Sequence, residues 1–307
     1  MINLKNQTEI NGTLIGIIMK EVVRRALVAI RSELHVMEIR GKLDYDGQAG
    51  DVVTTCDEVA QAIYVKVLTE CFPKFGIIAE EDSLRVACTL EGVDAYFTID
   101  AVDGTKALTR LQSKGIGTML SLVVDGQVIA AFIGDVMTKE VYGYRPIDDG
   151  EVVKVYRISE FEVAKILEIN AALQLADQYV LLRERPTDYS PLVQKIIRRP
   201  ADGGLFKNIQ IEGGSIGITM AQLWKSEVGG VILRPAYETP WDSSPIDGIS
   251  QQMEFHTYSI SPDGQVKRIV PVPPKKVLRR EDELLIIHQS RRAELAKFLD
   301  MPTLNQG

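Results

Sequence analysis

The sequence contains no apolar run that approaches the ~18 residues of a membrane-spanning helix, so we expect no membrane span. Its three cysteines are an odd number without the spacing of a metal site, which is typical of a reducing cytoplasm. The first ten residues, MINLKNQTEI, lack the basic stretch and apolar core of a secretory signal. We therefore expect a cytoplasmic protein that does not associate with membranes.

The chain also lacks an excess of positive charge. It carries 35 Lys and Arg against 42 Asp and Glu, a formal net charge of −7, which leaves no basic footprint for nucleic acid. Histidine is scarce and scattered (His35, His256 and His288), so a zinc site is not expected. No Gly-Lys-Ser/Thr loop for nucleoside triphosphates is present, and no cysteine is followed six positions later by arginine as in a cysteine phosphatase. An acidic protein that acts on an anionic substrate needs local cations, which metal ions can supply.

The length of 307 residues allows one large layered domain or two closely packed ones. Apolar spacing predicts a helix over 12–36. A second helix is expected to begin at a capping box formed by Thr55 and Glu58 and to end at Pro73. Strands are expected at 76–79, at 95–100 and in a hairpin around Asp125-Gly126. From 151 onward helices and strands alternate, beginning with a helix at 158–176. The sequence predicts an α+β metal-binding subdomain over 1–150 and an α/β substrate-side subdomain over 151–307.

A pair of acidic residues follows a predicted strand at each of two places, and at a third place a single acidic residue begins a predicted helix. Taken singly, each has an ordinary interpretation: an exposed pair at a strand end, a β-turn and a helix N-cap. Together they offer the oxygen ligands that Mg²⁺ prefers, so they predict a magnesium site. The residues are Glu80 and Glu81 after GIIA, Asp100 and Asp103 after YFTI, and Asp242 in TPWDSSP.

Four motifs occur in the order found in a known family. They are Asp-x-Val-Thr-x-x-Asp over 51–57, the acidic pair of IIAEED, the DAVDGT segment and Trp-Asp at 241–242. Over most of its length the chain resembles the inositol monophosphatase family, part of the Mg²⁺-dependent, lithium-sensitive phosphatases that include fructose-1,6-bisphosphatases. The resemblance implies a layered αβαβα sandwich of the inositol monophosphatase and sugar phosphatase type. It also implies hydrolysis of a small phosphorylated alcohol and, by analogy with the family, a homodimer.

The resemblance further implies a site of two or three Mg²⁺ ions. Glu80, Asp100 and the carbonyl of Val102 would hold the first ion. Asp100, Asp103 and Asp242 would hold the second, with Asp100 bridging the two. A weaker third ion would lie near Glu80. Lithium would inhibit by occupying the second position.

By the same resemblance, Asp51, Thr105 and Glu80 would be the catalytic residues. Thr105, paired with Asp51, would orient and deprotonate the water that attacks phosphorus in line. Backbone N–H groups of Gly104 and Thr105, at the start of a helix, would hold the phosphate oxygens.

Contacts to the substrate are expected from Glu81, Lys106, Gly214, Ser215 and Arg234, although surface charge is an equally ordinary interpretation of the lysine and the arginine. Lys106 and Arg234 resemble the 3′-phosphoadenosine 5′-phosphate phosphatases, whereas DGTK with a later Gly-Thr resembles histidinol-phosphate phosphatases. The chain departs from the family at Ala101, where proline is usual, and after Asp242, where small residues are usual. The metal site is therefore expected to be complete and the substrate pocket unusual. Both related phosphatase activities stay open as alternatives, as does a non-catalytic role as a regulatory interaction partner.

Overall fold

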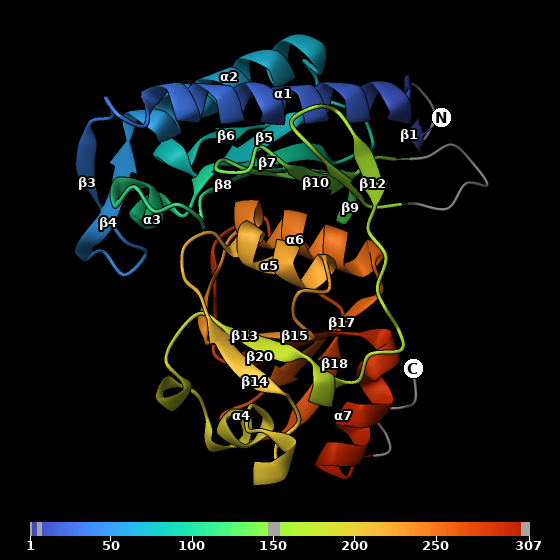
Figure 1. Ribbon diagram of the computed structural model, residues 1–307. Helices are drawn as coiled ribbons and strands as arrows, with labels where there is room; N and C mark the ends of the chain where they lie inside the picture. Colours follow the sequence, from blue (N-terminus) through green and yellow to red (C-terminus); the bar gives the residue numbers. More distant parts are fainter. Residues whose placement is uncertain (1, 5–7, 147–153, 302–307) are drawn as a thin grey trace.

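The computed structural model describes residues 2–4, 8–146 and 154–301 of the chain. Its helices and sheets alternate in five layers, with two helices above a large sheet, two helices in the middle, a second sheet, and two short helices below (Figure 1). The mixed fold class and the αβαβα layering expected from the sequence are confirmed. Among the described helices, none combines the length and apolar character needed to cross a membrane.

The outer helices α1 (Gly12–Glu33) and α2 (Thr55–Cys71) cover one face of the large sheet. Helix α1 begins where the Asn11 side chain accepts hydrogen bonds from the next backbone N–H groups, and it buries one apolar face. The capping box of α2 joins Thr54 to Asp57, so the expected box one residue later was wrong. Because the capping box begins at Thr54, its acidic member is Asp57, and the Asp57 carboxylate points inward to the site described below.

The large sheet has eight strands in the order β12-β11-β10-β9-β8-β7-β5-β6, and only β5 and β7 run parallel. The predicted hairpin is confirmed at Asp125 and Gly126, which both have positive φ and join β8 to β9. Strand β7 is buried throughout because helices cover both of its faces. The strands are β5 (Gly76–Ala79), β6 (Arg85–Val86), β7 (Ala95–Asp103), β8 (Gly117–Val124), β9 (Gln127–Asp135), β10 (Val141–Tyr144), β11 (Tyr156–Ile158) and β12 (Ala164–Ile166).

The helix predicted for 158–176 is wrong. This stretch forms the end of β11, then β12, and later one short 3₁₀ turn, Leu175–Asp177. The two strands form a hairpin that extends the edge of the large sheet beside β10, and pairing at that edge overrides the local helical spacing. The boundary expected at residue 150 lies outside the described residues, and the division into subdomains stays a prediction.

The middle layer consists of α5 (Ile216–Trp224) and α6 (Pro240–Gln252), which lie between the two sheets. The second sheet has the order β14-β13-β15-β20-β17-β18, with β13, β14 and β15 parallel. Alternate residues of β13 face the two adjoining layers. Leu181 packs toward α5 and α6, whereas Val180 and Leu182 pack on the opposite face, toward α4 and α7. The strands are β13 (Tyr179–Leu182), β14 (Asn208–Ile211), β15 (Gly230–Leu233), β17 (Phe255–Ile260), β18 (Val266–Ile269) and β20 (Glu283–His288).

The remaining elements are short. Two antiparallel ribbons, β3 with β4 and β16 with β19, contribute to the site described below. Lys42 of β3 contacts Glu80, and residues of β16 and β19 line the cavity. The outer face of the second sheet is covered by α4 (Pro191–Ile196) and α7 (Arg292–Leu299). The short elements are β1 (Ile2–Leu4), β2 (Thr8–Ile10), β3 (Ile39–Leu43), β4 (Ala49–Thr54), α3 (Thr105–Thr109), β16 (Ala236–Glu238) and β19 (Leu278–Arg280), with 3₁₀ turns at Glu81–Ser83, Pro186–Asp188, Pro200–Asp202 and Gln289–Arg291.

The strand that carries the site is anchored by an aromatic cluster. Phe97 of β7 is fully buried, and its ring centroid lies 5.3 Å from that of Phe72 and 5.6 Å from that of Phe75. We predict that Phe97→Ala lowers the free energy of unfolding by about 3–5 kcal/mol, because it leaves a cavity under α2. Chemical denaturation would measure the loss, with Val28→Ala on the exposed side of α1 as the control. A loss at Phe97 no larger than that at Val28 would contradict this account of the core.

Candidate metal centre and active site

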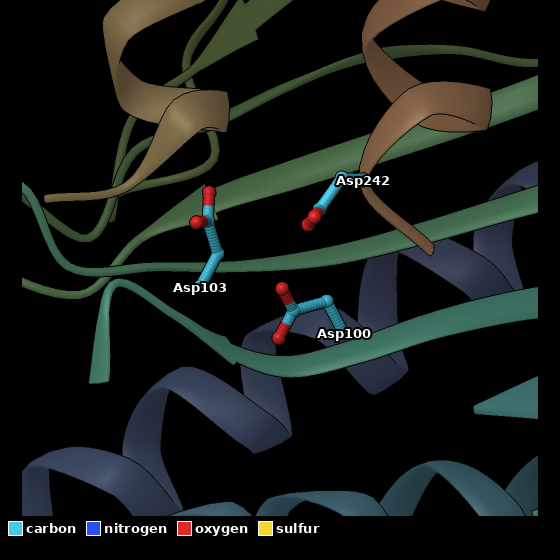
Figure 2. Close-up of side chains that lie close together, drawn as sticks. All are labelled: Asp100, Asp103 and Asp242. Atoms are coloured by element: carbon cyan, nitrogen blue, oxygen red, sulfur yellow. The ribbon is translucent and has the colours of Figure 1, made fainter. Parts of the chain in front are cut away.

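Three carboxylates converge where β7 ends and α6 begins. One oxygen from each of Asp100, Asp103 and Asp242 lies within 4.8 Å of the others, and Figure 2 shows the three side chains turned toward one another. Residues three apart on a regular strand point to opposite faces. Here Asp100 lies opposite Met119 and Asp103 opposite Gly117, so three steps on β7 match two on β8. This bulge turns both aspartates to one side.

The electrostatics of this triad call for a cation. Burial, together with repulsion from Glu80, Asp242 and Asp103, raises the pKa of Asp100 well above its usual range. Burial and Asp242 raise the pKa of Asp103 to about 6. The Oδ1 atom of Asp100 is buried and has no hydrogen-bond partner among the described residues. A buried carboxylate oxygen without a partner is costly, and a divalent cation bound by the triad would satisfy it.

The α5 N-terminus fixes Asp103 from the opposite side. Its carboxylate accepts hydrogen bonds from Ser215 Oγ at 2.5 Å, from the Ile216 N–H at 3.1 Å and from the Gly217 N–H at 2.7 Å. An ionised carboxylate has about four acceptor positions, so one stays available to a cation. Ser215 is fully buried, and its hydroxyl also accepts from the Ile218 N–H. Its hydroxyl therefore binds Asp103 and α5, and the substrate contact expected from Ser215 stays a prediction.

Glu80 follows β5, the parallel neighbour of β7, and reaches the same edge of the sheet. Lys42 Nζ of the β3–β4 ribbon lies 2.8 Å from Glu80 Oε1 and 2.9 Å from Glu81 Oε1. Burial raises the pKa of Glu80 to about 8, although Lys42 opposes this shift. The sequence did not single out Lys42, because a lysine in a Gly- and Asp-rich stretch has no distinctive pattern. Glu81 is held by this lysine, and the expectation that it contacts substrate stays untested.

Thr105 pairs with a different aspartate from the one expected. Its Oγ1 lies 3.2 Å from Asp57 Oδ1 and 3.0 Å from the carbonyl of Val102. Asp57 Oδ2 accepts from Thr54 within the α2 capping box, which leaves Oδ1 for Thr105. Asp51 lies on β4, earlier in the chain, with its carboxylate 4.0 Å from Lys42 and 3.8 Å from Lys106. The predicted Asp51–Thr105 pair is therefore wrong.

Gly104 lets the chain turn sharply between β7 and α3. It has φ of +92°, and a Cβ there would lie 2.4 Å from the Gly115 carbonyl oxygen and 2.7 Å from the Ser215 nitrogen. Only glycine fits such close backbone contact at positive φ. Helix α3 begins at Thr105 as expected. Whether the N–H groups of Gly104 and Thr105 bind phosphate stays a prediction.

A cavity of about 650 Å³ opens beside the triad. Asp103 and Asp242 line it, and so do Arg183 and Arg234. Such a volume is in the range of small-molecule sites. Lys106 is not among the lining residues, and its side chain is 62 % exposed. Arg183 was not predicted from the sequence. One pattern in the chain could have indicated it, because two apolar strands, YVLL and GVIL, are each followed directly by an arginine.

Comparison with known proteins identifies the family and supports the fold. The family model of the inositol monophosphatase family matches residues 14–244. The extragenic suppressor protein SuhB from Bartonella henselae superposes with a TM-score of 0.66 at 14% identity, over 96% of this chain and 99% of that one. An IMPase/NADP phosphatase complexed with NADP and Ca²⁺ gives 0.66 at 17% identity, over 95% and 97% of the two chains. Thermotoga maritima IMPase gives 0.63 at 16%, over 94% and 98%. Among curated proteins, none matches the sequence.

The raised pKa values predict how the stability of the metal-free protein changes with pH. The folded chain keeps protons on Glu80 and Asp103 up to pH values of about 8 and 6, whereas the unfolded chain releases them near 4.5 and 3.8. Unfolding then releases protons, so the free energy of unfolding falls as the pH rises from about 5 to 8. With saturating Mg²⁺ the stabilisation should instead grow with pH, because ligands bind the ion when deprotonated.

Thermal unfolding from pH 5 to 8, in EDTA and in Mg²⁺, would measure both trends. Glu80→Gln should flatten the slope in EDTA, whereas Glu70→Gln, at an exposed position of α2, should leave it unchanged. A metal-free protein that becomes more stable over this pH range would contradict the prediction.

Proposed function

The chain belongs to the inositol monophosphatase family, and we propose that it is a phosphatase that uses divalent cations to hydrolyse a small phosphorylated alcohol. The observation that carries this proposal is the triad, in which Asp100 and Asp103 are buried and the Asp100 Oδ1 atom has no hydrogen-bond partner in the described part of the chain. Structural neighbours bound to Mg²⁺ and phosphate and to D-inositol-1-phosphate support the choice of ion and of phosphomonoester.

Two or three Mg²⁺ ions are proposed, held as the triad and Glu80 allow. Asp100, Asp103 and Asp242 would share one ion, and Asp100, Glu80 and the Val102 carbonyl would share another. When bound, the ions would neutralise the phosphate and make both phosphorus and the attacking water more reactive. Lys42 balances part of the charge of Glu80 and Glu81.

The Thr105–Asp57 pair would hold and move the proton. Thr105 Oγ1 has one proton and two acceptors, the Val102 carbonyl at 3.0 Å and Asp57 Oδ1 at 3.2 Å. When the proton is donated to Asp57, the lone pairs of Oγ1 are free to accept a hydrogen bond from water. Burial raises the pKa of Asp57, which makes it a better proton acceptor than an exposed aspartate. As water attacks phosphorus, its proton passes to Thr105 Oγ1 while the threonine proton passes to Asp57 Oδ1. The bond from phosphorus to the ester oxygen breaks, and the leaving alkoxide takes up a proton to become the free alcohol.

Two expectations rest on other grounds. The homodimer rests on resemblance to the family, and the cytoplasmic location rests on the cysteine content of the sequence. Both stay predictions, as does inhibition by lithium.

We predict Mg²⁺-dependent release of inorganic phosphate from at least one member of a panel of phosphomonoesters, measured colorimetrically. Asp242→Asn should lower kcat/KM by about 100-fold or more, because it removes one ligand of the triad. Asp202→Asn, on an exposed turn far along the chain from the triad, should have no effect. A wild-type protein that releases no phosphate from any ester would point to the non-catalytic alternative, and an equally active Asp242→Asn variant would remove the proposed site.

The assignment of the proton acceptor has its own test. Asp57→Asn should lower kcat by about 100- to 10,000-fold with little change in KM, because a general base is lost. Asp51→Asn should lower it much less, because that carboxylate contacts only lysines at 3.8–4.0 Å. Steady-state kinetics on the best ester of the panel would decide between the two. Equal losses, or a larger loss at Asp51, would contradict the pairing of Thr105 with Asp57.

A further inference from the structure

Two arginines follow neighbouring parallel strands of the second sheet. Arg183 comes directly after β13 and Arg234 directly after β15, and these strands pair in parallel with Leu182 opposite Ile232. The carboxyl ends of adjacent parallel strands meet at one edge of a sheet, where ligands commonly bind. Both arginines line the cavity that also contains Asp103 and Asp242. The cavity therefore brings the carboxylates that would hold metal ions together with guanidinium groups.

Arg183 is fixed close to the triad. Its Nη2 donates to the carbonyl of Gly214 at 2.5 Å, and Gly214 precedes Ser215, which holds Asp103. The positive charge of Arg183 lowers the pKa of both Asp103 and Asp242, opposing the effect of burial. Arg183 and two carboxylates of the triad thus line one cavity, where a single ligand can contact both.

Among the described residues, Arg183 has no carboxylate within 4.0 Å, unlike the other arginines of the cavity. Arg280 Nε lies 2.9 Å from Glu238 Oε1, and Arg234 Nη1 lies 3.9 Å from Asp188 Oδ2. Glu184 and Asp247 also line the cavity without forming an ion pair with Arg183 in the described part of the chain. A guanidinium has five N–H donors, and one contact to a carbonyl leaves most of them available to an anion.

We propose that Arg183, assisted by Arg234, binds a second anionic group on the leaving alcohol, so that the substrate is a phosphomonoester carrying a further phosphate or carboxylate. This inference rests on the proposed phosphatase function. A neutral polyol bound in the cavity would remove water from the Arg183 guanidinium without supplying a negative charge, and this desolvation is unfavourable. An anionic group would instead form charge-assisted, potentially bidentate hydrogen bonds. The apolar wall formed by residues 269–272 leaves room for a flat or apolar part of the same leaving group.

The test compares substrates that differ only in the second anionic group. Adenosine 3′,5′-bisphosphate is paired with adenosine 3′-monophosphate, and 2-phosphoglycerate is paired with glycerol 2-phosphate, so the two pairs distinguish phosphate from carboxylate. The wild type should favour the member with the second anionic group in at least one pair. Arg183→Met should lower kcat/KM for that member by roughly 10- to 100-fold, mainly through KM, and change the partner compound less than about threefold.

Arg185→Met is the matched control, because Arg185 lies two residues further on, has an 85 % exposed side chain and is not among the residues that line the cavity. It should behave as the wild type. A purely structural role for Arg183, as a clamp on the Gly214 carbonyl, would lower the rates for both members of each pair equally. That result, or a wild type without preference in either pair, would overturn the inference.

A binding measurement separates this inference from the proposed function. Calorimetric titration of the full chain in Ca²⁺ with the same compounds requires no turnover. A compound with the second anionic group should bind roughly 10- to 100-fold more tightly than its partner, and Arg183→Met should abolish the difference. If the wild type releases no phosphate yet shows this difference, the proposed function fails and the anion site stands. Equal affinities within both pairs would overturn the anion site whether or not the protein is an enzyme.

Discussion

The structure depends on mutual repulsion among carboxylates that the fold holds together out of water. Asp100, Asp103 and Asp242 lie within 4.8 Å of one another, and Glu80 adds a fourth negative group. Each neighbouring element reduces part of this cost. Lys42 neutralises Glu80, and the N-terminus of α5 donates three hydrogen bonds to Asp103. What remains is the Asp100 oxygen that no described residue satisfies, and that residual cost would favour the binding of the proposed cation.

Backbone contact between distant segments makes this arrangement possible. A Cβ at Gly104 would lie 2.4 Å from the Gly115 carbonyl oxygen, and a Cβ at Gly214 would lie 2.5 Å from the same atom. The end of β7, the start of β8 and the loop before α5 therefore meet without intervening side chains. Because the Ser215 N–H also donates to the Gly115 carbonyl, α5 is aimed at Asp103. The N-terminus of α5 thus reaches the carboxylate triad through a few glycines.

The sequence predicted the parts of the site that are local in the chain. Asp100 and Asp103 share one short segment, and the motifs that contain Glu80 and Asp242 complete the acidic set from which the triad was predicted. The assignment of Asp51 as the partner of Thr105 failed because Asp57, the other aspartate of the same motif, lies in the first turn of α2, and that placement depends on where α2 begins. The helix predicted at 158–176 failed because the open edge of β10 recruits that stretch as strands. Neither error could be corrected from spacing alone, since both depend on contacts made by other parts of the chain.

Lys42 and Arg183 show the limit of local prediction most clearly. Each contributes one positive charge to the site. Lys42 comes from the β3–β4 ribbon and Arg183 from the second sheet, and neither of these elements carries Glu80 or a carboxylate of the triad. A lysine or an arginine in isolation is most often a surface residue, so only the fold gives it a partner. Carboxylates that hold metal ions must cluster in a narrow geometry, and a short motif can encode that geometry. Charges that select a leaving group need only line a cavity, so they can be supplied from any strand end, and substrate preference can change while the motif stays the same.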